Sequence, residues 1–137
     1  MPSQLFDIGH EYDFEVIGLT CQDKDYRLVW AINMEMGWNL ERDLDHKVIY
    51  KAHSTLHSRF VFMDEQEGKA IRLLVNKGEG GSLLPELQGI DYVLLLEGFG
   101  KNEILELSGK LRRIAFVQAS LLLDLNKIKS KYNLLTD

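Results

Sequence analysis

The stretch Ile90-Asp91-Tyr92-Val93-Leu94-Leu95-Leu96-Glu97 is almost continuously apolar, and Gly98 and Gly100 follow it closely. A short apolar run bounded by turn residues is typical of a strand that is covered on both faces. We therefore predict that residues 90–97 form a central strand of a sheet.

The residues that come after this stretch predict a helix and one more strand. Between Asn102 and Arg112, the apolar residues recur at helical spacing and share one face. From Ala115 to Leu123 apolar residues alternate, which predicts a strand, although a helical stripe also fits this segment. The helix and the strand would both pack beside the central strand.

The residues that precede the apolar stretch 90–97 predict a strand, a helix and a hairpin. Tyr12 to Thr20 alternates as a strand, Lys24 to Trp38 has helical spacing, and two strands around residues 59–63 and 71–75 form a hairpin. Residues 43–58 fit a strand or a helix. The order favours one α+β domain over residues 1–137, an antiparallel sheet of about five strands with two helices packed on one face, as in a ferredoxin-like or ACT-like sandwich.

Composition limits the classes of function. The chain has 137 residues, a formal net charge of −5 and a single cysteine, Cys21. An acidic domain without a basic patch is a poor binder of nucleic acid. A lone cysteine allows no internal disulfide, and no apolar run approaches the ~20 residues of a membrane-spanning helix. We expect a cytoplasmic protein that binds neither nucleic acid nor membrane.

The segment Leu84-Pro85-Glu86-Leu87-Gln88-Gly89-Ile90-Asp91-Tyr92 resembles the signature of the bacterial IPExxxVDY family. Its Pro, Glu, Asp and Tyr positions match, while Leu84 and Ile90 are conservative departures. The resemblance implies a compact bacterial domain and assigns no reaction, cofactor or catalytic residue. In physical terms, Glu86 and Asp91 either bond to nearby backbone or line a pocket with Tyr92 behind them.

Two further patterns suggest ligand sites, each with a plainer alternative. On one continuous helix, His46, His53 and His57 would share a face that could bind zinc, but surface histidines are the favoured interpretation. The turn Gly98-Phe99-Gly100-Lys101 precedes a helix, as an anion-binding loop does, but Glu103 replaces the third glycine of a dinucleotide motif. We predict no cofactor and no catalytic residue.

The predicted first helix carries two apolar stripes. One faces the sheet, and the other consists of Tyr26, Trp30, Met34 and Trp38. Tryptophan, tyrosine and methionine are enriched at protein interfaces. The second stripe is therefore either an interface, with a protein partner or with a second copy in a homodimer, or a surface that residues 43–58 cover within the monomer.

These patterns support two functional hypotheses. The leading one is a non-enzymatic interaction domain that uses the second stripe. The alternative is an ACT-like regulatory domain whose small-molecule ligand binds beside the loops 78–91 and 98–102, at Glu86, Asp91, Tyr92, Gly98, Gly100 and Lys101. An enzyme ranks third, because no nucleophile–base pair or metal-ligand set stands out.

Overall fold

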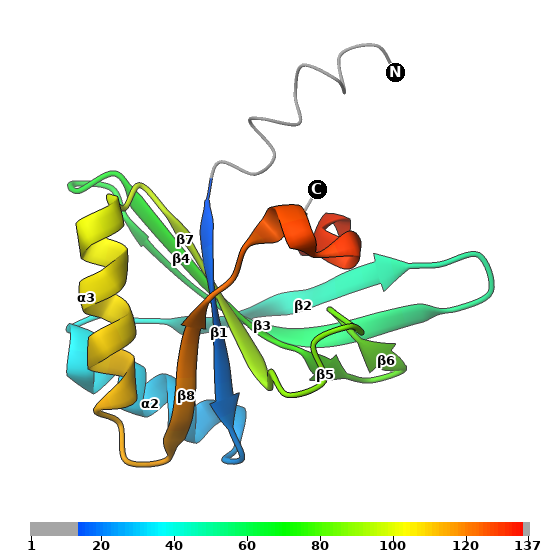
Figure 1. Ribbon diagram of the computed structural model, residues 1–137, viewed down its shortest axis with the longest axis horizontal. Coiled ribbons are helices and arrows are strands. Elements are labelled where there is room, and N and C mark those ends of the chain that lie inside the picture. Colours follow the sequence, from blue (N-terminus) through cyan, green and yellow to red (C-terminus); the bar gives the residue numbers. More distant parts are fainter. Residues whose placement is uncertain (1–13, 136–137) are drawn as a thin grey trace, which may run out of the picture.

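A computed structural model describes residues 14–135 of the chain, so the predicted start of the first strand at Tyr12 lies outside this range. Two α-helices and a set of strands make up the described part (Figure 1), and two 3₁₀ turns come after the last strand. In chain order the elements are β1 (Glu15–Cys21), α2 (Asp25–Met36), β2 (Glu41–Ile49), β3 (Ser54–Asp64), β4 (Lys69–Val75), β5 (Lys77–Gly78), β6 (Gly81–Ser82), β7 (Tyr92–Glu97), α3 (Lys101–Arg112), β8 (Val117–Leu122), η1 (Leu125–Lys127) and η2 (Lys129–Leu134).

The main sheet is open and antiparallel, with six strands in the order β2-β3-β4-β7-β1-β8. The predicted α+β class with an antiparallel sheet is confirmed, and this sheet has one strand more than the expected five or so. The additional strand is β2, most of which lies in residues 43–58, where the sequence fits a strand or a helix. β2 and β3 form a long hairpin, with a bulge between Asp43 and His46.

Strand β7 is central, as its apolar sequence predicts. It pairs with β4 on one side and with β1 on the other. Tyr92, Leu94 and Leu96 face the helices, whereas Val93 and Leu95 face the opposite side of the sheet. All five side chains are buried, so β7 contributes to both hydrophobic cores.

Helices α2 and α3 pack on one face of the sheet, as predicted. Their buried residues, which include Leu28 and Ile32 of α2 and Ile104 and Leu111 of α3, join one core cluster with the sheet. Ser108 of α3 hydrogen-bonds to Ser120 of β8 across 2.9 Å, which fixes this helix over that strand. Residues 117–122 are a strand, so the helical alternative for this segment is wrong.

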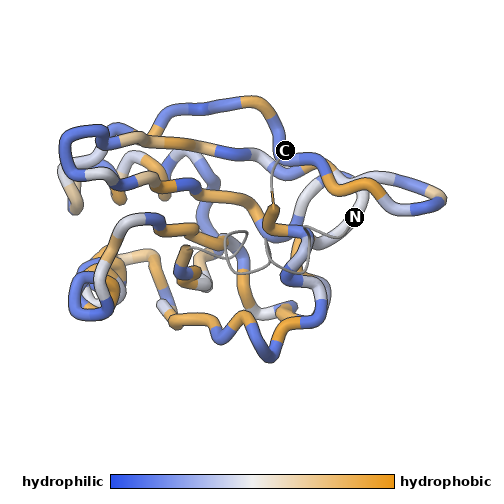
Figure 2. Tube along the Cα trace, turned by 90° about the horizontal axis from the view of Figure 1, so that it is seen from above, coloured by the Kyte–Doolittle hydropathy of each residue, from blue (hydrophilic) through white to orange (hydrophobic). Residues whose placement is uncertain are grey.

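The other face of the sheet is covered by a loop and two short 3₁₀ helices instead of α-helices. Residues 83–90 and residues 125–135, which we name the C-terminal clasp, close over it, with Leu83, Leu84 and Leu134 fully buried. Figure 2 shows apolar stretches along the strands and polar residues at most of the turns. Two apolar faces on one sheet require two covering layers, and the clasp is part of the second.

Candidate functional site

The side of α2 that points away from the sheet is apolar and exposed. Tyr26, Trp30 and Met34 recur every four residues, and 60%, 66% and 69% of their surfaces are accessible. Leu28 and Ile32, on the opposite side of the same helix, are fully buried. Tryptophan is usually well buried in folded proteins, so three large apolar side chains in one row form an unusual surface, which we name the α2 face.

No residue between 14 and 135 covers the α2 face. Residues 43–58, which were a possible cover, belong instead to the β2–β3 hairpin. Arg27 flanks the row, with an ion pair to Asp23 at 3.1 Å and its guanidinium 5.1 Å from the centre of the Phe116 ring. The apolar row of the α2 face is therefore open, and the Arg27 guanidinium lies beside it.

Trp38 does not belong to the α2 face. The helix ends at Met36, two residues earlier than expected, because Gly37 adopts a left-handed conformation with φ of 70°. The chain turns there, and the half-buried Trp38 packs edge-on against Phe99 at a ring separation of 6.2 Å. The predicted four-residue stripe is thus a row of three, and Trp38 contacts the helix-side core.

The residues of the IPExxxVDY-like motif bond within the fold. The Glu86 carboxylate accepts hydrogen bonds from the backbone N–H (3.0 Å) and the hydroxyl of Ser130 in the clasp. Burial acts to raise the pKa of the Glu86 carboxyl, but these bonds act the other way and leave its pKa below the usual value. Glu86 therefore ties the motif loop to the C-terminal clasp, 44 residues away in sequence.

Asp91 and Tyr92 connect β7 to the segment that leads into α2. The Asp91 carboxylate accepts the Cys21 N–H at 2.8 Å and lies 3.5 Å from the Lys77 ammonium. The Tyr92 ring is buried and its hydroxyl donates to the Asp23 carbonyl, while burial raises the pKa of that hydroxyl. Both side chains have partners within the fold, which agrees with the structural interpretation of the motif.

Asn76, which sequence analysis did not single out, organises the motif loop. Its side chain is fully buried and donates to the carbonyls of Leu87 (3.1 Å) and Ile90 (2.7 Å). Its side-chain oxygen accepts the Leu84 N–H at 2.8 Å. An asparagine between two strand segments gives no signal in a single sequence that would distinguish this role from an ordinary turn.

The Gly98–Lys101 turn lies at the other end of β7 from the motif. Six residues of strand separate the two loops, roughly 16–20 Å, so they cannot form one small-molecule site. The Glu103 carboxylate accepts the Gly100 N–H at 2.9 Å and pairs with Lys69 at 2.6 Å, and both contacts lower its pKa. The protein's own carboxylate thus occupies the position at which the turn sequence suggests a bound anion.

Gly98 itself is required by packing. It has φ of +83°, and a Cβ there would lie 2.2 Å from the carbonyl oxygen of Gly68. The turn after β7 therefore packs directly against the turn between β3 and β4. A close backbone contact, and not a ligand, accounts for this glycine.

The zinc hypothesis for the three histidines is wrong in its premise, because they do not lie on one helix. His46 is on β2 and His57 on β3, while His53 stacks on Tyr50 at the hairpin turn. His57 donates from Nδ1 to the Val75 carbonyl and accepts from Thr55, and its burial lowers its pKa. Within residues 14–135, no three His, Cys, Asp or Glu side chains are grouped to hold a metal ion.

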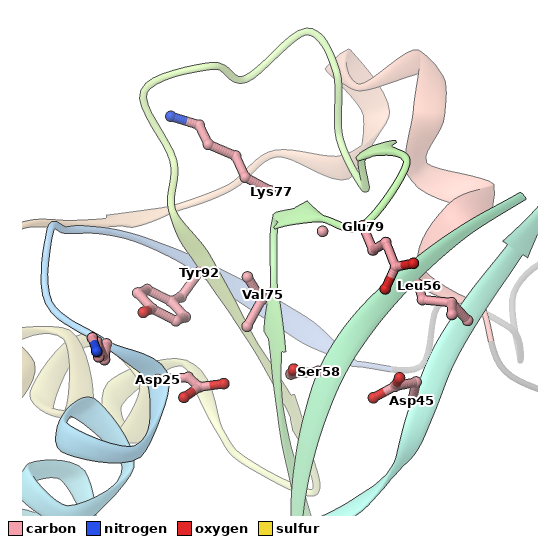
Figure 3. A pocket seen from close by; sticks show the side chains of 10 residues that line it. Asp25, Asp45, Leu56, Ser58, Val75, Lys77, Glu79 and Tyr92 are labelled. Carbon is pink, nitrogen blue, oxygen red and sulfur yellow. The ribbon is translucent and has the colours of Figure 1, made fainter.

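A cavity of about 360 Å³ opens between the N-terminus of α2 and the β2–β3 hairpin. Leu56 and Val75 contribute apolar surface. Figure 3 shows the carboxylates of Asp25 and Asp45 pointing toward Ser58 from opposite sides, while Lys77 points away. Tyr92 and Glu79 also line the cavity, so it is bordered by the motif strand although Glu86 and Asp91 do not enter it.

Comparison of the chain with protein-family models and with curated proteins gives no match. Among the described helices, none is both long and apolar enough to cross a membrane. Function is therefore inferred from the geometry of the chain itself.

Proposed function

We propose that this chain is a cytoplasmic, non-enzymatic interaction domain that docks another protein through the α2 face. The observation that carries the proposal is the accessible row of Tyr26, Trp30 and Met34 on the outer side of a helix. Tryptophan and tyrosine provide much of the binding energy at many interfaces, and methionine is enriched there. Exposed apolar surfaces of this kind mark interaction sites.

The size of the α2 face favours a different protein as the partner over a second copy. If each side chain contributes about 65% of ~200 Å², the row offers roughly 400 Å² per protomer. Symmetric pairing of two such rows would bury roughly 800 Å² in total, less than the ~1,200 Å² of a small stable interface. A partner groove that also encloses the flanks of the helix would bury more, as in helix-in-groove recognition.

Replacing Trp30 by Glu should abolish partner binding and leave the domain folded. The side chain is exposed, so a charge there costs the monomer little, whereas desolvating that charge at an interface weakens affinity by at least about 30-fold. The tagged chain would be purified from the cells that naturally produce it. A co-purifying protein would then be isolated, and its affinity measured against both variants by calorimetry.

Met63→Glu is the matched control, because Met63 is 64% exposed on β3 and lies outside the α2 face. It should keep the affinity of the unmodified chain. Equal binding by Trp30→Glu and Met63→Glu would overturn the proposal. A purified chain that dimerises alone, and loses the dimer with Trp30→Glu, would assign the face to a second copy instead. Loss of the circular dichroism spectrum in Trp30→Glu would show that the row is part of the core.

A second candidate function is the ACT-like binding of a small molecule, and the cavity beside Tyr92 favours it. Its volume of about 360 Å³ is that of a metabolite site. The charged residues of its lining are Asp25, Asp45, Glu79, Lys24 and Lys77, a mixture that suits an amino acid with a cationic side chain. Arginine or lysine at millimolar concentration should raise the melting temperature, and Asp45→Asn should remove this shift. Glu65→Gln, in the β3–β4 turn, is the control. An unchanged melting temperature across both amino acids would reject this candidate.

We also propose the finer assignments of fold and family. The neighbouring strands β8, β1, β7 and β4, with a helix after β1 and another after β7, support a ferredoxin-like framework into which the β2–β3 hairpin is inserted. Pro85, Glu86, Asp91 and Tyr92 support membership of the IPExxxVDY family. Neither assignment adds a reaction or a cofactor.

A further inference from the structure

The two edges of the main sheet differ in chemistry. The edge strand β2 carries Glu41, Arg42, Asp43, Asp45 and Lys47, and a bulge interrupts its pairing with β3. Charges and bulges on an edge strand prevent it from pairing with another chain. The opposite edge strand, β8, has the sequence Val-Gln-Ala-Ser-Leu-Leu, with no charge at all. One edge is therefore protected against strand pairing and the other is not.

The backbone of β8 presents open hydrogen-bond donors. Leu123 N–H, just past the strand, donates to the Val16 carbonyl across 2.9 Å. In an antiparallel pair, alternate residues direct their N–H groups to the same side. The N–H groups of Ser120 and Leu122 therefore point away from β1, to the side on which no described strand lies.

Exposed leucines flank this edge on both faces of the sheet. Leu121 and Leu122 are 54% and 49% exposed, and as consecutive strand residues they lie on opposite faces. Leu105 of α3 is 62% exposed. Glu103, Glu106 and Lys110 of α3 line a cavity with Met36 and Trp38, so that side of the helix faces α2. Leu105 lies on the other side, toward the β8 edge.

Gly109 lies one helical turn after Leu105 on the same side of α3, and we name this side the α3 row. Nothing lies within 4 Å of the position that its Cβ would occupy, so the surface is open there. Leu105 and Gly109 lie at equal distances along α3 on either side of residue 107. The next residue, Ser108, contacts Ser120 near the middle of β8, so the centre of this helix segment lies beside the centre of the strand. A single two-fold axis beside Ser120 would thus pair β8 with its copy and place each Leu105 against the partner's Gly109 position.

We infer that β8 and α3 form a homodimer interface, in which two copies of β8 pair antiparallel and join the two sheets into one. The occupant is a second copy of this chain because the surface is complementary to itself about one axis, in the strand and in the helix. It is also neutral in its centre, although the whole chain carries a net charge of −5 that keeps copies apart elsewhere.

The ends of the α3 row make the dimer dependent on salt. Lys101 and Arg112 are in this row, and the two-fold axis brings Lys101 of one copy toward Arg112 of the other. Both are exposed, so their repulsion is screened by salt. Raising the salt concentration from about 0.05 M to about 0.5 M should therefore strengthen the dimer, because the remaining contacts are apolar and backbone hydrogen bonds.

The test is the mass of the purified full chain by light scattering, together with backbone amide exchange. The unmodified chain should be dimeric, and the amides of Ser120 and Leu122 should be protected in the dimer. Leu122→Lys and Leu105→Lys should each weaken the dimer by at least tenfold and expose those two amides. Leu44→Lys, at a residue 79% exposed on the other edge strand, is the matched control and should stay dimeric.

Three results would overturn the inference. One is a chain that stays monomeric when its concentration is raised about tenfold above that used for the first light-scattering measurement. Another is a dimer that survives both lysine variants. The third is a dimer that Trp30→Glu removes while Ser120 and Leu122 exchange freely, because that dimer would use the α2 face. Circular dichroism of each variant separates loss of pairing from loss of folding.

Discussion

Asn76→Ala should be among the most destabilising single substitutions in this domain, at about 3–5 kcal/mol of unfolding free energy. The change removes two hydrogen bonds to carbonyls and one from the Leu84 N–H, all within a fully buried site. Each buried group that loses its partner costs about 1–3 kcal/mol. The midpoint of urea denaturation is the measurement.

Asn33→Ala provides the control for the same chemical change. Asn33 also makes side-chain hydrogen bonds in both directions, to Leu40 O at 3.2 Å and from Leu40 N at 2.9 Å. It is only partly buried at the end of α2, so water replaces the lost bonds and the cost should be about 1 kcal/mol. A loss of only about 1 kcal/mol for Asn76→Ala, equal to that of the control, would mean that the motif loop does not depend on Asn76.

The central part of the fold is predictable from local sequence, and its edge is not. β7 is predictable because its residues are buried on both faces, so nearly every position must be apolar. In β2 only His46 and Val48 are buried, and the other positions carry charges or face solvent. A protected edge strand has no hydrophobic period, which is why residues 43–58 could be neither assigned nor used to place the histidines.

The sequence predicts which residues form the α2 face, but it does not predict that their side chains are exposed. The spacing of Tyr26, Trp30 and Met34 defines a row, but a buried row and a docking row have the same spacing. The packing of α2 as an outer layer decides between them. Trp38 lies outside the row because Gly37 ends the helix. Glycine commonly ends helices, so the local sequence already indicates that the four-residue stripe is too long.

The bonds of the motif residues depend on contacts distant in sequence. Glu86 reaches Ser130 and Asp91 reaches the backbone of Cys21, across 44 and 70 residues respectively. The periodicity of apolar residues along the sequence does not predict contacts between residues so far apart. The motif residues thus connect the central strand, the start of α2 and the C-terminal clasp, and these connections give the motif a structural role.

The two proposed surfaces lie on opposite sides of α3 and need not compete. A dimer formed through β8 carries two copies of the α2 face on one continuous sheet. A partner with two matching sites would then bind the dimer with an affinity that exceeds that of one face, because the second contact is intramolecular. Leu122→Lys should reduce this gain and leave the affinity of a single α2 face unchanged.

Leu134→Ala should destabilise the domain by about 2–5 kcal/mol, because this fully buried side chain joins the C-terminal clasp to the second core. Polar contacts also hold the clasp, since Asn133 donates to the Leu83 carbonyl at 2.9 Å and His46 contacts the Asn133 carbonyl. Leu44→Ala, at an exposed site, should change stability by no more than about 0.5 kcal/mol.

The slope of the urea transition shows how the clasp is coupled to the sheet. A lower midpoint with an unchanged slope means that the clasp and the six-stranded sheet unfold together. A lower slope means that the variant has already released the clasp, because less surface remains to be exposed. We expect the first result, since Leu134 packs in the same cluster as Val93 and Leu95 of the central strand. No change in midpoint would show that the second face of the sheet is stable without its cover.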